Sequence, residues 1–88
     1  MEKKTYTITS SEGLHARPCS MLVSAVTPFK SEVTITYKER TANLKSIMGV
    51  MGMGIESGAQ VEITADGADE SEAIAKVDDI MKKESIGE

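Results

Sequence analysis

The spacing of apolar residues in this chain switches repeatedly between two positions and three to four positions, and no linker or repeat interrupts the pattern. Apolar residues at every second position predict strands, whereas spacings of three to four predict helices. The predicted strands cover residues 5–9, 33–37, 41–44 and 61–65. The predicted helices cover residues 16–27, 46–51 and 69–83. A chain of 88 residues can bury only one core, so we expect a single domain over residues 1–88.

The predicted order of elements is βαββαβα. Each strand is apolar on one face only, so a single layer of helices is enough to cover the sheet. The most economical fold is therefore α+β, with a four-stranded antiparallel sheet covered on one face by three helices and its threonine-rich face toward water. Lys38-Glu39-Arg40 is the expected hairpin tip between the second and third strands, although it lacks an Asn-Gly type of turn.

Composition and charge exclude several classes of function. One Cys allows no internal disulfide, and with one His a closed Cys/His metal cage is impossible, so we expect no metal or other cofactor. A net charge of −4 and an aromatic content of 3% argue against direct nucleic-acid binding. No apolar run approaches the roughly 20 residues of a membrane span, and the polar start of the chain leads into no signal-peptide core. We therefore expect a cytoplasmic protein that does not insert into membranes.

The only histidine lies in Gly13-Leu14-His15-Ala16-Arg17-Pro18, where a turn meets the start of the first predicted helix. Backbone N–H groups at a helix start point outward and bind anions, and Pro18 removes none that the helix needs. Arg17 adds a permanent cation within one turn of the imidazole. A phosphoryl group on His15 would meet all of these donors together, so His15 is the candidate acceptor of a phosphoryl carrier. The plainer alternative is a surface histidine that only caps a helix.

The second candidate region is Leu44-Lys45-Ser46-Ile47-Met48-Gly49-Val50-Met51. Ser46 is the expected N-cap of a helix that neighbouring glycines keep short. A phosphate on Ser46 would suit a helix start electrostatically, so its addition would cost the fold little. Ile47, Met48 and Met51 cannot all face inward from so short a helix, and we expect them to provide a soft exposed patch for docking partners. The alternatives are a serine that only caps the helix and methionines that belong to the core.

Cys19 lies four residues after His15, which would place both on one helix face if His15 were helical. A thiolate–imidazole enzyme is therefore one alternative function. Because His15 is expected before the first helical turn and no third catalytic residue is near, the favoured interpretation of Cys19 is a small, partly buried apolar side chain. The charged segment 78–84 is expected to be a solvated helix face.

With these motifs, the chain closely resembles HPr, the histidine-containing phosphocarrier family of the bacterial phosphoenolpyruvate:sugar phosphotransferase system. Residues 13–18 match the family's active-site motif, and residues 43–51 match its regulatory-site motif of the Gram-positive type. The resemblance covers essentially the whole chain and implies an open-faced β-sandwich. Cys19 departs from the small residue usual in the family, and it leaves room for oxidation sensitivity if the thiol is accessible.

The resemblance implies a monomeric carrier rather than an enzyme. His15 would accept a phosphoryl group from Enzyme I, which is charged by phosphoenolpyruvate, and pass it to the IIA domains of sugar permeases. Arg17 would steady the phosphorylated ring. Ser46 would be the target of an HPr kinase/phosphorylase. Phosphorylated at Ser46, the protein would act with a LacI-type catabolite control protein in carbon catabolite repression.

Two further alternatives are binding modules without carrier activity. One is a regulatory paralogue that is phosphorylated on Ser46; such paralogues lack the active-site histidine, so His15 argues against it. The other is a module that binds a single partner through the methionine patch, with His15 only as a cap. This second module would tolerate His15→Ala without functional loss.

Overall fold

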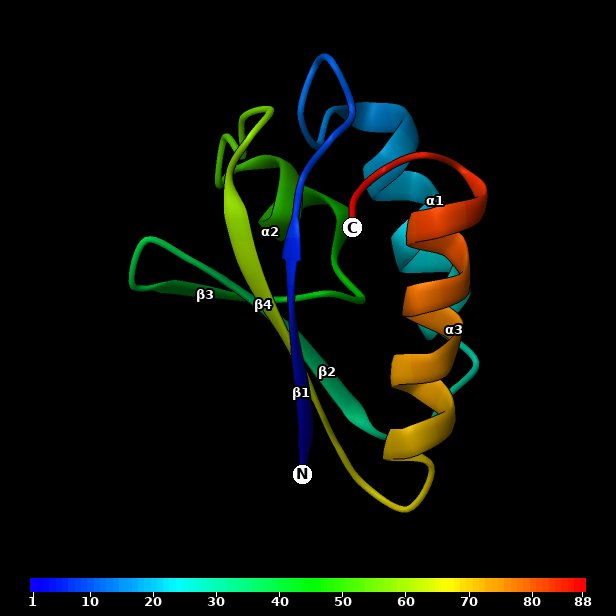
Figure 1. Ribbon diagram of the computed structural model, residues 1–88. Coiled ribbons are helices and arrows are strands. Elements are labelled where there is room, and N and C mark those ends of the chain that lie inside the picture. The colour runs from blue at the N-terminus through cyan, green and yellow to red at the C-terminus, as the bar shows by residue number, and fades with distance from the viewer.

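The computed structural model describes all 88 residues and places seven elements in the predicted order (Figure 1). The strands are β1 (Glu2–Thr7), β2 (Glu32–Tyr37), β3 (Arg40–Asn43) and β4 (Gln60–Asp66). The helices are α1 (Ala16–Val26), α2 (Ile47–Met51) and α3 (Glu70–Lys83). All strand pairs are antiparallel, and the order across the sheet is β1-β4-β2-β3.

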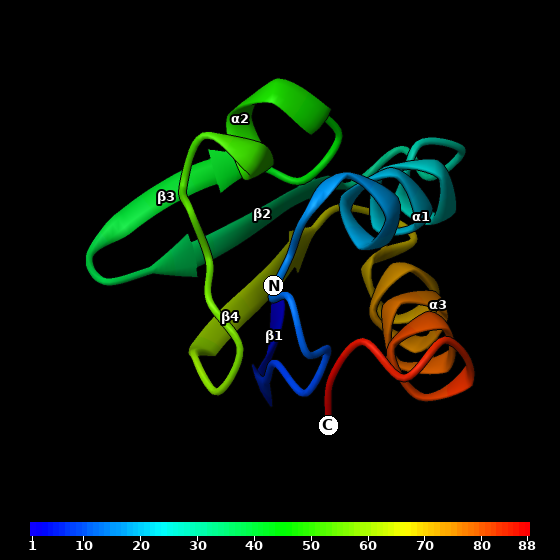
Figure 2. The ribbon, with the colours of Figure 1, turned by 90° about the horizontal axis from the view of Figure 1, so that it is seen from above.

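The helices form one layer on one side of the sheet, and the other side is uncovered (Figures 1 and 2). In β2, Val33, Ile35 and Tyr37 are buried, while Thr34 and Thr36 alternate with them on the open face. A cluster of 20 buried residues fills the space between sheet and helices. The prediction of an antiparallel sheet with helices on one face is therefore confirmed.

The first strand differs from its predicted bounds. The alternation around Tyr6 and Ile8 indicated residues 5–9, whereas β1 runs from Glu2 to Thr7. Its extent follows the partner strand, because the ladder with β4 continues from Thr7 opposite Gln60 to Glu2 opposite Ala65. Ile8 is buried as predicted, and beyond the strand it makes an isolated bridge with Gly87.

The β2–β3 hairpin is tighter than predicted. Arg40 is not part of the tip, because it pairs with Tyr37 as the first residue of β3. Lys38 and Glu39 alone form the turn, with φ angles of +49° and +67°. Two-residue turns with positive φ match the twist of a hairpin, but they are usually built from Asn and Gly. The chain therefore accepts two side chains in the left-handed region at this exposed tip.

The start of α3 is tied to the loop between α1 and β2. Its N-cap residue, Asp69, accepts hydrogen bonds from the backbone N–H of Lys30 at 2.8 Å and of Ser31 at 2.9 Å, and from the Ser31 hydroxyl. These donors lower the pKa of Asp69 to about 2, with the Ser31 hydroxyl as the largest cause. Ser31 is a buried polar residue, and this bond satisfies its hydroxyl.

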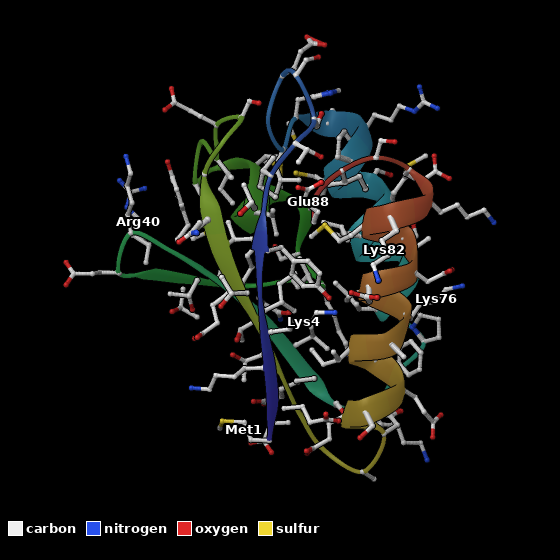
Figure 3. The ribbon with its side chains drawn as sticks, in the orientation of Figure 1. Met1, Lys4, Arg40, Lys76, Lys82 and Glu88 are labelled. Atoms are coloured by element: carbon white, nitrogen blue, oxygen red, sulfur yellow. The ribbon has the colours of Figure 1, made fainter.

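The middle of α3 does not have the purely solvated face expected for residues 78–84. Asp78 accepts from Lys4 of β1 and pairs with Lys82 at 3.0 Å, which together lower its pKa to about 2. The buried Tyr6 hydroxyl also donates to Asp78, at 3.3 Å. Figure 3 shows Lys4 reaching from β1 toward α3, where Lys82 lies. Lys4 and Tyr6 are more than 70 positions away in the chain, so their contacts with Asp78 could not be predicted from neighbouring residues.

Candidate functional site

The loop before α1 is held by a close backbone approach. The N–H of Leu14 donates to the Ile55 carbonyl at 3.0 Å, and Gly13 adopts φ +72°. A Cβ at position 13 would lie 2.3 Å from the Ile55 oxygen, so only glycine fits here. The buried Leu14 side chain anchors the loop in the core. These contacts set the direction in which the chain enters the helix.

His15 is the N-cap residue of α1, as the sequence predicted at the loop-to-helix junction. Its carbonyl accepts from the N–H of Cys19 at 3.1 Å, which closes the first helical turn. Its side chain is half-buried and makes no capping hydrogen bond. Helix geometry leaves the N–H groups of Ala16 and Arg17 without intrahelical acceptors. The imidazole and these donors are therefore available to a ligand, and the cap-only interpretation of His15 loses its structural basis.

His15 and the exposed Arg17 line the same surface pocket, which has a volume of about 290 Å³. The other lining residues are Ser10, Glu12, Pro18, Met21, Glu84 and Ile86. Ser10 and Glu12 belong to the turn before Gly13 and were not among the predicted site residues. Glu84 and Ile86 carried no local signal, because the C-terminal segment reaches the pocket through the hydrogen bonds of Thr9 and Ser10 to the Ile86 carbonyl.

The pocket combines possible donors for an oxyanion with two carboxylates, those of Glu12 and Glu84. An anion bound to the imidazole would meet backbone N–H donors, the positive end of the α1 dipole and the guanidinium of Arg17. No group of three or more His, Cys, Asp or Glu side chains in the molecule is arranged to hold a metal ion.

Cys19 lies in the core and not in this pocket. It is fully buried rather than partly buried as expected, and its thiol donates to the Leu14 carbonyl at 3.2 Å. Burial raises the pKa of the Cys19 thiol, which disfavours the reactive thiolate. A thiolate–imidazole enzyme built on His15 and Cys19 is not supported, because the thiol faces the core. Oxidation sensitivity at Cys19 would require an accessible thiol, and this thiol is buried.

Ser46 is the N-cap of α2, as predicted. Its Oγ accepts from the N–H of Gly49 at 3.2 Å, and the side chain is half-buried. A Cβ at Gly49 would come within 3.3 Å of that Oγ, so glycine leaves room beside the hydroxyl. A group added to Ser46 would therefore stand at the start of a helix with open space next to it.

The three apolar residues singled out on α2 all reach the surface. Ile47, Met48 and Met51 are 36%, 79% and 42% exposed, and Val50 alone anchors the helix in the core. We refer to Ile47, Met48 and Met51 as the α2 patch. The helix α2, which carries this patch, packs against α1 and lies in the same half of the molecule as the start of α1 (Figure 1). The predicted exposure of this patch is confirmed.

A family model described as the PTS HPr component phosphorylation site matches residues 2–83. The chain belongs to the HPr family. This family comprises phosphocarriers of the phosphotransferase system, so the resemblance found in the motifs is confirmed. None of the three helices is long and apolar enough to cross a membrane.

Solved structures agree with this family assignment. The histidine-containing phosphocarrier protein of Mycoplasma is 40% identical, with a TM-score of 0.96 over 99% of both chains. HPr of Thermoanaerobacter tengcongensis is 36% identical, with a TM-score of 0.90 over 94% of this chain and 93% of that one. Crh of Bacillus subtilis, described as a domain-swapped dimer, is 35% identical with a TM-score of 0.74 over 84% and 85%. The open-faced β-sandwich of HPr proteins is therefore the fold of this chain.

Proposed function

We propose that this HPr protein carries a phosphoryl group on His15, from Enzyme I to the IIA domains of sugar permeases. The observation that supports this most is the His15 side chain, which makes no capping bond at an open helix start and shares a pocket with Arg17. Enzyme I and IIA domains would supply the remaining catalysis, so the protein is a carrier rather than an enzyme. Working with these partners, it would act in the cytoplasm as a monomer.

In the proposed transfer, the ring nitrogen of His15 nearer the main chain, the one that the resemblance to the HPr family implies, attacks the phosphorus of the donor. The new N–P bond forms as the bond between phosphorus and the donor breaks, and the electron pair of that bond returns to the donor. The N–H groups of Ala16 and Arg17 and the Arg17 guanidinium then bind the phosphoryl oxygens. Transfer to a IIA domain reverses these steps with a new acceptor.

Ser46 is the proposed regulatory site, phosphorylated by an HPr kinase/phosphorylase. A phosphate there would sit at the N-terminus of α2, where the Gly49 N–H already donates to Oγ, so the fold would persist. The dianion would stand directly beside the α2 patch, which we assign to partner docking. It would weaken docking of Enzyme I by desolvation and repulsion, and it would favour a LacI-type catabolite control protein in carbon catabolite repression.

Ser46→Asp tests this regulation. We expect slower phosphoryl acceptance from Enzyme I with the unfolding midpoint close to that of the wild type, whereas Ser46→Ala keeps the rate. Initial rates at several Enzyme I concentrations show whether docking is affected. A Ser46→Asp variant with the full acceptance rate contradicts the proposed switch.

The second candidate is a regulatory binding module phosphorylated on Ser46 without carrier activity. The similarity to Crh, a catabolite repression protein, favours it. It differs from the carrier in one measurable property, because it would accept no phosphoryl group at His15. Crh is a dimer, so size-exclusion chromatography with light scattering is the check on the proposed monomer.

The deciding experiment mixes the protein with phosphoenolpyruvate, Mg²⁺ and a bacterial Enzyme I. Intact mass should show one added phosphoryl group that is labile to acid and stable to base, and that is absent from His15→Ala. Cys19→Ala is the matched control and should still be phosphorylated. If the folded protein gains no group while Enzyme I charges a control acceptor, the carrier function is wrong.

A further inference from the structure

The six methionines of this chain differ in exposure: Met1, Met48 and Met51 are exposed, Met21 is half-buried, and Met53 and Met81 are buried. Met48 is 79% exposed and Met51 42%, whereas Met53 is 8% exposed and Met81 is fully buried. Exposed apolar side chains that gather in one patch often mark an interaction site, and a flexible thioether suits a docking surface. The same exposure leaves the sulfur of Met48 open to solutes.

The only thiol of the chain does not compete for oxidants. Cys19 is fully buried, and its Sγ is engaged with the Leu14 carbonyl. Cysteine oxidation requires an accessible thiolate, whereas a methionine thioether reacts without losing a proton. Accessible sulfur is therefore concentrated in methionine, and the α2 patch holds two of these side chains close together in sequence.

We propose that Met48, together with Met51, is a reversible oxidation site that controls docking at the α2 patch. The oxidant is a peroxide: the thioether sulfur attacks one peroxide oxygen, an S–O bond forms, the O–O bond breaks, and hydrogen peroxide is reduced to water. The sulfur loses two electrons and becomes a sulfoxide. A dithiol-dependent methionine sulfoxide reductase returns it to the thioether, with a disulfide and water as products.

The sulfoxide would weaken docking without unfolding the protein. It converts an apolar side chain into one with a strong acceptor, and burying that acceptor in an interface without a donor is unfavourable. Val50, which anchors α2, has no sulfur, and the two oxidised side chains point to solvent in the free protein. This part of the proposal rests on the proposed docking of Enzyme I at the α2 patch.

Met1 provides an internal control for the effect of position. It is 71% exposed, nearly as much as Met48. It lies at the opposite end of the sheet from α2 (Figures 1 and 3). Oxidation of Met1 should therefore be as fast as that of Met48 and have no effect on docking.

The test treats the whole protein with limiting hydrogen peroxide and maps sulfoxides by peptide mass spectrometry over time. We expect sulfoxides at Met48 and Met1 first, then at Met51, later at the half-buried Met21, and none at Met53 and Met81 while the protein stays folded. Calorimetric titration with Enzyme I should then show an about tenfold higher Kd for the oxidised protein. Methionine sulfoxide reductases A and B with dithiothreitol should restore the original Kd.

The matched variant is Met48→Leu/Met51→Leu, which keeps the patch apolar and of similar volume. Its Kd for Enzyme I before peroxide treatment is the reference, and peroxide treatment, to which its Met1 and Met21 remain open, should leave that Kd unchanged. Oxidation of Met48 no faster than of buried Met81, or an unchanged Kd after Met48 oxidation, overturns the proposal.

Failure of the proposed carrier function would look different. The untreated protein would then accept no phosphoryl group and bind no Enzyme I, which overturns the docking part of the proposal. The peptide map would still confirm or overturn Met48 as the oxidation site.

Discussion

The two ends of the helical layer use their polar groups in opposite ways. Where α3 begins, Asp69 accepts three hydrogen bonds from Lys30 and Ser31. Where α1 begins, the side chain of the N-cap residue, His15, makes no capping bond and lines a pocket with Arg17. Both residues occupy the same position of a helix. The Asp69 carboxylate is satisfied within the fold, whereas we propose that the His15 side chain serves a ligand.

This difference separates stability from function in the molecule. Substitutions at the start of α3 should change the free energy of unfolding and leave phosphoryl transfer alone. At the start of α1, changes to the His15 and Arg17 side chains should do the reverse, because Gly13 and the buried Leu14 hold the loop that carries them. The following variants test this separation, from the largest expected effect to the smallest.

Gly13→Ala should be the most damaging, with a loss of about 2–4 kcal/mol of unfolding free energy. The new Cβ would meet the Ile55 carbonyl at 2.3 Å in a left-handed backbone conformation. Urea unfolding measures the loss. Gly58→Ala is the control, since Gly58 has φ +88° but no atom within 4 Å of its Cβ position. An equal loss in both variants means that the approach to Ile55 does not hold the site.

Arg17→Ala should slow phosphoryl acceptance from Enzyme I by about 10–100-fold, because a charge-assisted hydrogen bond contributes about 1.5–3 kcal/mol. Arg17 is exposed and makes no ion pair in the fold, so the urea midpoint should not change. Stopped reactions analysed by intact mass give the rate. Arg40→Ala, on the β2–β3 hairpin labelled in Figure 3, should transfer normally. A lower urea midpoint in Arg17→Ala would contradict this prediction and show that Arg17, like Asp69, stabilises the fold.

Asp69→Asn should make stability less dependent on acid pH. The pKa of Asp69 falls from 3.8 to about 2 on folding, so its stabilisation is present above the unfolded value and is lost as pH falls toward 2. The variant should be less stable than the wild type at neutral pH, with a shallower decline below pH 4. Asp78, whose pKa is also about 2, keeps part of that decline. Urea midpoints between neutral and acid pH measure the difference.

The exposed Asp79, on the same helix, is the control for Asp69. Asp79→Asn should leave the pH profile as it is in the wild type. If Asp69→Asn keeps the full acid decline, the bonds from Ser31 and Lys30 do not stabilise the ionised carboxylate.

Glu39→Gly should have the smallest effect and the opposite sign, a gain of about 0.5 kcal/mol. Glu39 has φ +67° in the two-residue turn, and glycine adopts this conformation without the Cβ penalty. Thermal unfolding measures the gain, and Glu39→Ala, which keeps the Cβ, should show none. Phosphoryl transfer should be the same in all three proteins, because the tip is not part of the His15 pocket.

Much of the site could be predicted because its chemistry is local. His15 and Ser46 could be placed at helix starts from neighbouring residues alone. The turn residues and the proline in the first helical turn place His15, and the short helix that follows places Ser46. The exposure of the α2 patch followed from the shortness of its helix. The pocket around His15 could not be predicted in full, because Glu84 reaches it from the far end of the chain.

The sequence by itself determined the type and order of the elements and the residues that begin α1 and α2, because periodicity and capping depend on neighbours along the chain. Only the tertiary structure decided the strand order β1-β4-β2-β3, the complete burial of Cys19, the partners of Asp78 and the approach of Gly13 to Ile55. Each of these depends on the packing of separate segments, and some of the paired residues are more than 70 positions apart. Periodicity and capping signals do not reveal such pairings, since many spatial arrangements of the same elements are compatible with the same local patterns.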